Sequence, residues 1–194
     1  MRIFIFSMSI FFLSACNDNE NPKVVAQNNI DTAQEKIAFF PVTSYLQGQI
    51  HDIREKGLTP IKYTIINAHT DSVMIKFDQL NGLMAEFLKP KIDSANMIPF
   101  YTESKFLDQT LDAFTFNYDA KPDLPDSVKL KHWDVYVDPT TSKIKRVYMV
   151  KKISADKQLQ LTWQSNKWCK ITTIVSSPNG ASAVEKEEKI SWDY

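Results

Sequence analysis

The stretch HWDVYVDPTTSKIKRVYMV, residues 132–150, decides the fold of this chain. Trp133, Val135 and Val137 recur at every second position, which is typical of a β-strand with one buried face. The four residues DPTT at 138–141 have the composition of a turn, and a second alternating run follows them. Because consecutive strands joined by a short turn pair antiparallel, the stretch predicts a β-hairpin.

The same alternation continues on both sides of this hairpin. On its N-terminal side, Phe114, Phe116 and Tyr118 repeat with a period of two. On its C-terminal side, short polar turns separate further apolar runs. The sequence therefore predicts an antiparallel meander, with strands after the first at 144–153, 159–163, 168–175 and 184–192.

The first half of the chain has a different period. Apolar residues at helical spacing predict a helix over 43–56, with Ser44 and Gln47 as a capping box and Gly57 as the stop. A strand is predicted at 59–66, and residues 72–77 are ambiguous. A second helix is predicted from an Asp78 cap to Leu88. The expected fold class is α+β, with these two helices packed on a mainly antiparallel sheet of six or seven strands.

The N-terminus carries the one specific motif of the chain. Arg2 precedes an apolar stretch, residues 3–13, that is too short to span a bilayer and has the length of a signal-peptide core. The stretch ends in Leu13-Ser14-Ala15-Cys16, which resembles the lipobox of bacterial lipoproteins. The resemblance implies cleavage before Cys16, acylation of that cysteine, and anchoring in the cell membrane or the outer membrane, with the domain in the periplasm or at the cell surface. An ordinary secretory cleavage site fits less well, because Leu13 stands where a small residue is preferred.

These boundaries divide the chain into three parts: a signal peptide at 1–15, a lipidated and flexible tether at 16–36, and a single α+β domain at 37–194. Removal of Arg2 with the signal peptide leaves 22 basic and 23 acidic side chains, so the overall charge gives no indication of nucleic-acid binding. Residues 121–170 carry 11 basic and 5 acidic side chains. That excess indicates either an anionic partner or, preferably, the solvated face of a sheet.

Local catalytic motifs are absent from the sequence, and we expect no enzymatic activity and no cofactor. The four glycines are too far apart for a phosphate-binding loop, and there is no G-x-S-x-G, H-E-x-x-H or C-x-x-C. If Cys16 is acylated, Cys169 is the only thiol and has no disulfide partner. An alternative enzymatic reading rests on His132, Asp134 and Cys169. We also expect no metal site, although His69-x-Asp71 and His132-x-Asp134 would supply four ligands if they met.

All four tryptophans lie in the second half of the chain. We interpret them mainly as the core of a twisted sheet, but Trp133, Trp163, Trp168 and Tyr136 are also a candidate ligand face. The predicted function is therefore a non-enzymatic binding or structural role in the cell envelope. The partners are the membrane, through the N-terminal lipid, and an envelope protein or a hydrophobic ligand. A second hypothesis is a carrier of lipid or another hydrophobic ligand. It rests only on the outline of a helix followed by a curved sheet, which is similar to lipoprotein-carrier half-barrels, and it predicts a cavity of several hundred Å³.

Overall fold

The computed structural model describes residues 39–192, apart from the side chains of Ser94 and Asn96. Cys16, the predicted signal peptide and the predicted tether lie outside the described residues. None of the helices in the described part of the chain is long and apolar enough to cross a membrane.

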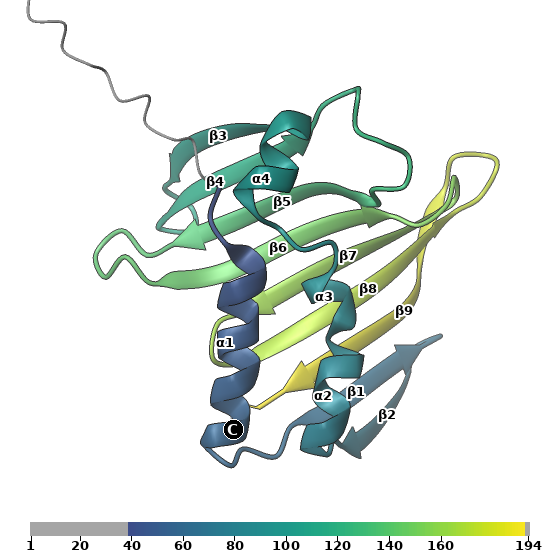
Figure 1. The fold of residues 1–194 in the computed structure, drawn as a ribbon. Helices are drawn as coiled ribbons and strands as arrows, with labels where there is room; N and C mark the ends of the chain where they lie inside the picture. Colours follow the sequence, from purple (N-terminus) through teal and green to yellow (C-terminus); the bar gives the residue numbers. More distant parts are fainter. Residues whose placement is uncertain (1–38, 193–194) are drawn as a thin grey trace, which may run out of the picture. The chain divides into compact units, whose positions relative to one another are not determined.

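Nine antiparallel strands form one sheet in the described chain, in the order β2-β1-β9-β8-β7-β6-β5-β4-β3 (Figure 1). Every pair of neighbours except β1 and β9 is consecutive in the chain. This confirms the antiparallel meander, because short connections leave each strand beside the one before it. The strands are β1 Ile61–Ile66, β2 His69–Met74, β3 Tyr101–Asp108, β4 Ala113–Ala120, β5 Leu130–Val137, β6 Ile144–Lys152, β7 Lys157–Gln164, β8 Trp168–Ser176 and β9 Ser182–Ser191.

The helices of the described residues all lie before β3. They are α1 Val42–Glu55, α2 Phe77–Leu83, α3 Ala85–Leu88, α4 Ser94–Met97 and the 3₁₀ turn η1 Ile98–Phe100. Figure 1 shows α1, α2 and α3 running across one face of the sheet. Phe87 of α3 lies edge-on to Trp163 of β7, with ring centroids 5.3 Å apart.

The sheet has two faces of different chemistry, which we call inner and outer. The inner face carries Trp133 and Trp163, and the outer face carries His132 and Asp134, because successive side chains of a strand alternate. Both tryptophans are fully buried and belong to one apolar cluster that also includes Leu46 of α1. The core therefore lies on the inner face, between the sheet and the helices.

The predicted number of strands was wrong, since the sheet has nine strands in place of six or seven. The ambiguous region at 72–77 contains the end of β2, and β3 was not predicted at all. These two strands form the edges of the sheet, and most of their residues are exposed. An edge strand with little burial on either face has no alternation for a sequence pattern to detect.

The predicted helix caps were also wrong. Helix α1 begins at Val42 after Pro41 and has no side-chain cap. The predicted second helix is divided at Met84 into α2 and α3, and α2 begins before Asp78. Its first turn is held by Gln79, whose side-chain oxygen accepts a hydrogen bond from the Lys76 backbone N–H at 3.1 Å. The predicted stop at Gly57 is confirmed, because its φ of +62° is a conformation that glycine adopts without strain.

Candidate functional site: a groove beside helix α1

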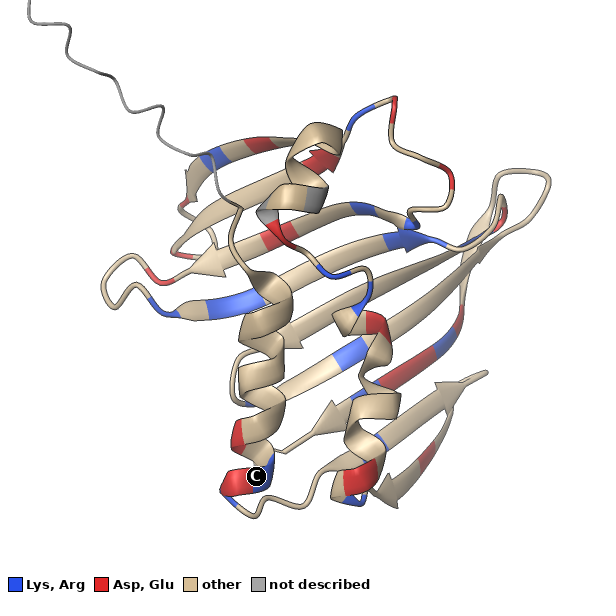
Figure 2. Cartoon of the chain, viewed as in Figure 1, with Lys and Arg blue, Asp and Glu red and all other residues tan. Residues whose placement is uncertain are grey.

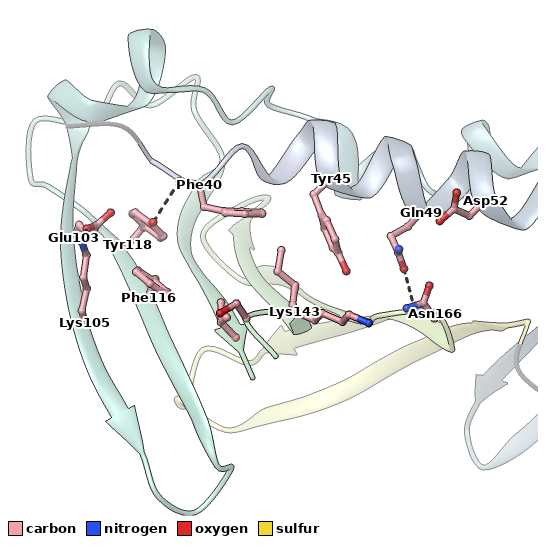
Figure 3. Close-up of a pocket in the computed structure, with 13 residues that line it drawn as sticks. Phe40, Tyr45, Gln49, Asp52, Glu103, Lys105, Phe116, Tyr118, Lys143 and Asn166 are labelled. Carbon is pink, nitrogen blue, oxygen red and sulfur yellow. Dashed lines mark hydrogen bonds and ion pairs between the residues drawn. The ribbon is translucent and has the colours of Figure 1, made fainter. Parts of the chain in front are cut away.

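A groove of about 740 Å³ lies between α1 and the sheet and is open to solvent (Figure 3). One wall comes from α1 and the residues before it, and the opposite wall comes from the hairpin β3–β4. The floor comes from the β5–β6 hairpin and the turn between β7 and β8. The lining side chains are Phe40, Tyr45, Gln49, Asp52, Glu103, Lys105, Phe116, Tyr118, Val137, Ser142, Lys143, Ile144 and Asn166.

The surface of the groove is largely apolar and aromatic. Phe40 and Tyr45 point into it from the helix side, and Phe116 and Tyr118 point into it from β4 (Figure 3). Val137 of β5 lines the groove, and Phe114 and Leu107, which follow it in the same row on β4 and β3, continue the inner face beyond the groove. The groove therefore lies in the part of the inner face that α1 leaves open.

Hydrogen bonds hold α1 at both ends of the groove. Tyr45 shares a hydrogen bond of 2.6 Å with the Ser165 hydroxyl. The Asn166 backbone N–H donates to the Gln49 side-chain oxygen at 2.8 Å. Before the helix begins, the Phe40 backbone N–H donates to the Tyr118 hydroxyl at 3.4 Å. These contacts fix the helix above the sheet and keep the space between them preformed.

Charged groups stand at the rim of the groove. Glu103 and Lys105 form an ion pair of 2.9 Å, and the Lys105 ammonium lies 5.5 Å from the centre of the Phe116 ring. Burial, followed by contact with Glu103, raises the pKa of the Tyr118 hydroxyl, so that this hydroxyl stays neutral. Lys143 is exposed on the β5–β6 loop. The rim is thus polar and solvated, while the interior of the groove has aromatic walls and the aliphatic side chains of Val137 and Ile144 on its floor.

The sheet separates the four aromatic residues predicted as a ligand face. Trp133 and Trp163 point to the inner face and are 0 % exposed, so they build the core. Trp168 and Tyr136 are half-buried on the outer face, since each is paired with an outer-face residue of the neighbouring strand. The Lys189 ammonium lies 5.2 Å from the Trp168 ring, and the Arg146 guanidinium lies 5.6 Å from the Tyr136 ring. No single surface contains all four.

The residues of the enzymatic alternative do not meet either. His132 and Asp134 lie on the outer face of β5, whereas Cys169 lies on the inner face of β8 beside Trp163. Three strand spacings of about 4.8 Å separate β5 from β8, or roughly 14 Å. Burial also raises the pKa of the Cys169 thiol, which disfavours the thiolate that a nucleophile needs.

The two His-x-Asp pairs are even further apart. His69 and Asp71 are exposed on the edge strand β2, and six strand spacings separate that strand from β5. Within the part of the chain that the structure describes, no group of three or more His, Cys, Asp or Glu side chains is arranged to hold a metal ion. The four ligands suggested by the sequence therefore do not form one site.

His132 instead forms the centre of a charged network on the outer face. Its Nε2 lies 2.9 Å from Asp134 and its Nδ1 lies 2.7 Å from Asp119, so both ring nitrogens donate when the ring is charged. Asp134 is buried and also accepts from Asn117 at 2.6 Å and from the Tyr136 hydroxyl at 3.1 Å. The hydrogen bond to Asp134, opposed by burial and assisted by Asp119, raises the pKa of His132 to about 9.

This network predicts a pH dependence of stability. Because folding raises the pKa of His132 from its ordinary value of about 6.5, its contribution is complete below pH 6.5 and disappears as the pH rises through 9. Between pH 6 and pH 9.5 we expect the wild type to lose on the order of 2 kcal/mol more unfolding free energy than a His132→Gln variant. Urea denaturation at both pH values measures the difference. A His51→Gln variant, altered at an exposed helix position, should follow the wild type, and parallel curves for all three proteins would refute the assignment.

Comparison with known proteins finds no family model, no curated protein and no solved structure that matches this chain. The groove therefore has to be interpreted from its own residues. Sequence reasoning missed it, because its lining comes from four separate parts of the chain that share no motif. Of its lining, only the alternations that include Phe116, Tyr118 and Val137 were visible beforehand.

Proposed function

We propose that this protein is a lipid-anchored, non-enzymatic lipoprotein of the bacterial cell envelope that binds a hydrophobic ligand in the groove beside α1. The anchor in this proposal is Cys16, on the strength of the lipobox-like sequence before it. The observation that carries the ligand-binding role is the groove itself, with aromatic side chains on its walls, the aliphatic Val137 and Ile144 on its floor, and a polar rim. The ligand expected there has an apolar body and a polar end that stays near solvent.

The size and chemistry of the groove support this role. Sites for small ligands usually have volumes of about 300–1,000 Å³ and mostly apolar linings with a few polar groups. At about 740 Å³ the groove lies within that range. Burial of one aromatic side chain or an equivalent apolar group contributes roughly 1.5–3 kcal/mol, from which the cost of association has to be subtracted. The fixed position of α1 favours binding further, because little ordering is required of the protein.

A structural role without a ligand is the competing proposal within the same class. It would leave the groove as an unfilled gap beside the helix. The two proposals differ in one measurable property, which is saturable binding of an apolar probe at this place.

The test uses the chain from Asn17 onward and a dansyl-labelled undecanoic acid, whose emission rises in an apolar site. We expect saturable binding by the wild type. For Phe116→Ala, which removes an aromatic side chain from the groove, we expect the affinity to fall by about tenfold or more. Phe106→Ala is the matched control, because Phe106 lies on the adjacent strand but on the outer face. It should bind as the wild type does. Absence of saturable binding, or equal loss in both variants, would refute the ligand-binding role.

A further inference from the structure

We infer that the end of the β3–β4 hairpin contacts the lipid surface to which the protein is anchored, an inference that rests on the proposed anchor at Cys16. The contact is made by four exposed apolar side chains, Phe106, Leu107, Leu111 and Phe114. The partner is the bilayer itself. The four side chains do not line the ligand groove, although the hairpin end adjoins it.

Exposed apolar side chains are concentrated on this hairpin. Of the nine large hydrophobic side chains that are exposed among the described residues, four fall within residues 106–114. Phe106 is 49 % exposed on the outer face, and its neighbour Leu107 is equally exposed on the inner face. Phe114 pairs with Leu107, and Leu111 lies in the turn. Apolar groups therefore surround the hairpin end on both faces, an arrangement that isolated surface hydrophobics do not produce.

Four backbone groups of the turn are already hydrogen-bonded to side chains of the protein. The Asp108 carboxylate accepts hydrogen bonds from the backbone N–H groups of Thr110 and Leu111, at 2.9 and 3.1 Å. From β6, the Lys145 ammonium donates to the backbone carbonyls of Leu111 and Asp112, at 3.1 and 3.0 Å. An unsatisfied backbone group entering an apolar phase costs several kcal/mol, and these contacts reduce that cost at the turn.

The charges around the hairpin predict which lipids it prefers. Four basic and four acidic side chains lie on β3–β4 and β5–β6 close to this end, and Figure 2 shows the two signs interspersed rather than separated. Attraction to an anionic surface is therefore not the source of binding. The contact depends on apolar insertion and should form on uncharged phosphatidylcholine. The charged residues are Glu103, Lys105, Asp108, Asp112, Asp138, Lys143, Lys145 and Arg146.

The place where the described chain begins favours this hairpin, rather than the other exposed apolar group, as the part that contacts the lipid. Twenty-two residues separate Cys16 from Phe39, a length that spans at most about 80 Å when fully extended. The described chain begins beside the hairpin, since Phe40 lines the same groove as Phe116 of β4. Val73 and Met74, the other exposed group, lie on the edge strand β2, seven strand spacings from β4. The described chain thus begins at the edge of the sheet that carries the hairpin.

The experiment uses the full chain, processed in its host and reconstituted into phosphatidylcholine vesicles. A Leu111→Cys variant carries a nitrobenzoxadiazole label, and Met74→Cys carries the same label as the matched control. Cys169 is buried, and the unsubstituted chain treated in the same way measures any label at the native cysteines. With nitroxide lipids in the vesicles, we expect at least half of the emission at position 111 to be quenched and less than a tenth at position 74.

Each other outcome overturns a stated part of the proposal. If the chain stays with the vesicles and position 111 is quenched no more than position 74, the hairpin contact is wrong and the anchor stands. If the label at position 111 is shielded from water but not quenched by the lipids, the hairpin contacts protein, for example a second copy, and the lipid contact is wrong. If the chain leaves the vesicles as completely as a Cys16→Ala variant does, the anchor and the contact that rests on it are both wrong.

Discussion

Replacement of Trp133 by alanine is expected to destabilise the protein by about 3–5 kcal/mol, the usual cost of removing a fully buried large aromatic side chain. Trp133 has no exposed surface and lies at the centre of an aromatic cluster. Its ring is stacked on Tyr118 at 4.5 Å and meets Tyr101 and Phe39 edge-on at 4.6 and 5.8 Å. The variant loses both the transfer free energy of the indole and the contacts of the surrounding rings. Because a domain is stable by only about 5–15 kcal/mol, this is a large fraction of the total.

Urea denaturation followed by far-ultraviolet circular dichroism measures this change. Trp168→Ala is the matched control, because Trp168 is half-buried on the outer face and its replacement leaves no enclosed cavity. It should cost about 1 kcal/mol or less. Trp133→Phe should lie between the two, since the Trp133 indole N–H has no hydrogen-bond partner to lose. Equal costs for Trp133→Ala and Trp168→Ala would contradict the division of the sheet into a core face and a solvent face.

Among the strands that the sequence predicts correctly, β5 and β7 have one buried face. In β5 and β7 every second side chain belongs to the core, so that Trp133 and Trp163 stand out as a period of two. The strands β2 and β3 lack such a face. Every residue of β2 is exposed, and its only neighbour in the sheet is β1. Backbone pairing alone makes it a strand, and backbone pairing leaves no mark on the side-chain pattern.

Helix ends were predicted less well than helix interiors, and Thr43 shows why. A capping box at Ser44 was a reasonable local solution, but Thr43 lies inside the helix and accepts a hydrogen bond from the Ile92 N–H at 2.9 Å. Ile92 is 49 residues away. A local rule has no access to a partner at that separation, and the start of α1 is therefore fixed by tertiary contacts.

The groove could not be predicted for a similar reason. Its walls meet only after β4, β5 and β6 have paired and after Tyr45 and Gln49 have reached the turn between β7 and β8. The sequence did indicate that the tryptophans belong mainly to the core, which holds for Trp133 and Trp163. It gave no indication that the open part of the inner face would be lined by phenylalanine and tyrosine. A candidate site formed by pairing has no local motif.

Loss of the Glu86 carboxylate is expected to destabilise the protein by about 3 kcal/mol, because it would leave a buried ammonium without its counter-charge. Lys151 points to the inner face of β6, and its side chain is only 4 % exposed. Its Nζ lies 2.8 Å from the Glu86 carboxylate and also donates to the Glu86 backbone carbonyl. Burial lowers the pKa of Lys151, against the opposing effect of Glu86. In Glu86→Ala only the carbonyl remains as a partner, and the expected cost is at the low end of the range for such pairs because Glu86 is half-exposed.

Removal of the lysine itself should have a different result. Lys151→Met replaces the buried charge with an apolar side chain of similar length, and we expect a change within about 1 kcal/mol, since desolvation of an ion pair largely offsets its attraction. The double variant Glu86→Ala/Lys151→Met should therefore be more stable than Glu86→Ala alone, by about 2 kcal/mol. The control pair is Lys170 and Glu187 on the outer face, whose charged groups are also 2.9 Å apart. Because the Lys170 side chain is 35 % exposed and keeps access to water, Glu187→Ala should cost less than about 1 kcal/mol. If urea denaturation gives the same loss of unfolding free energy for Glu86→Ala and Glu187→Ala, the burial of Lys151 does not control the energy of its ion pair. The sheet would then tolerate an unpaired charge beneath α3.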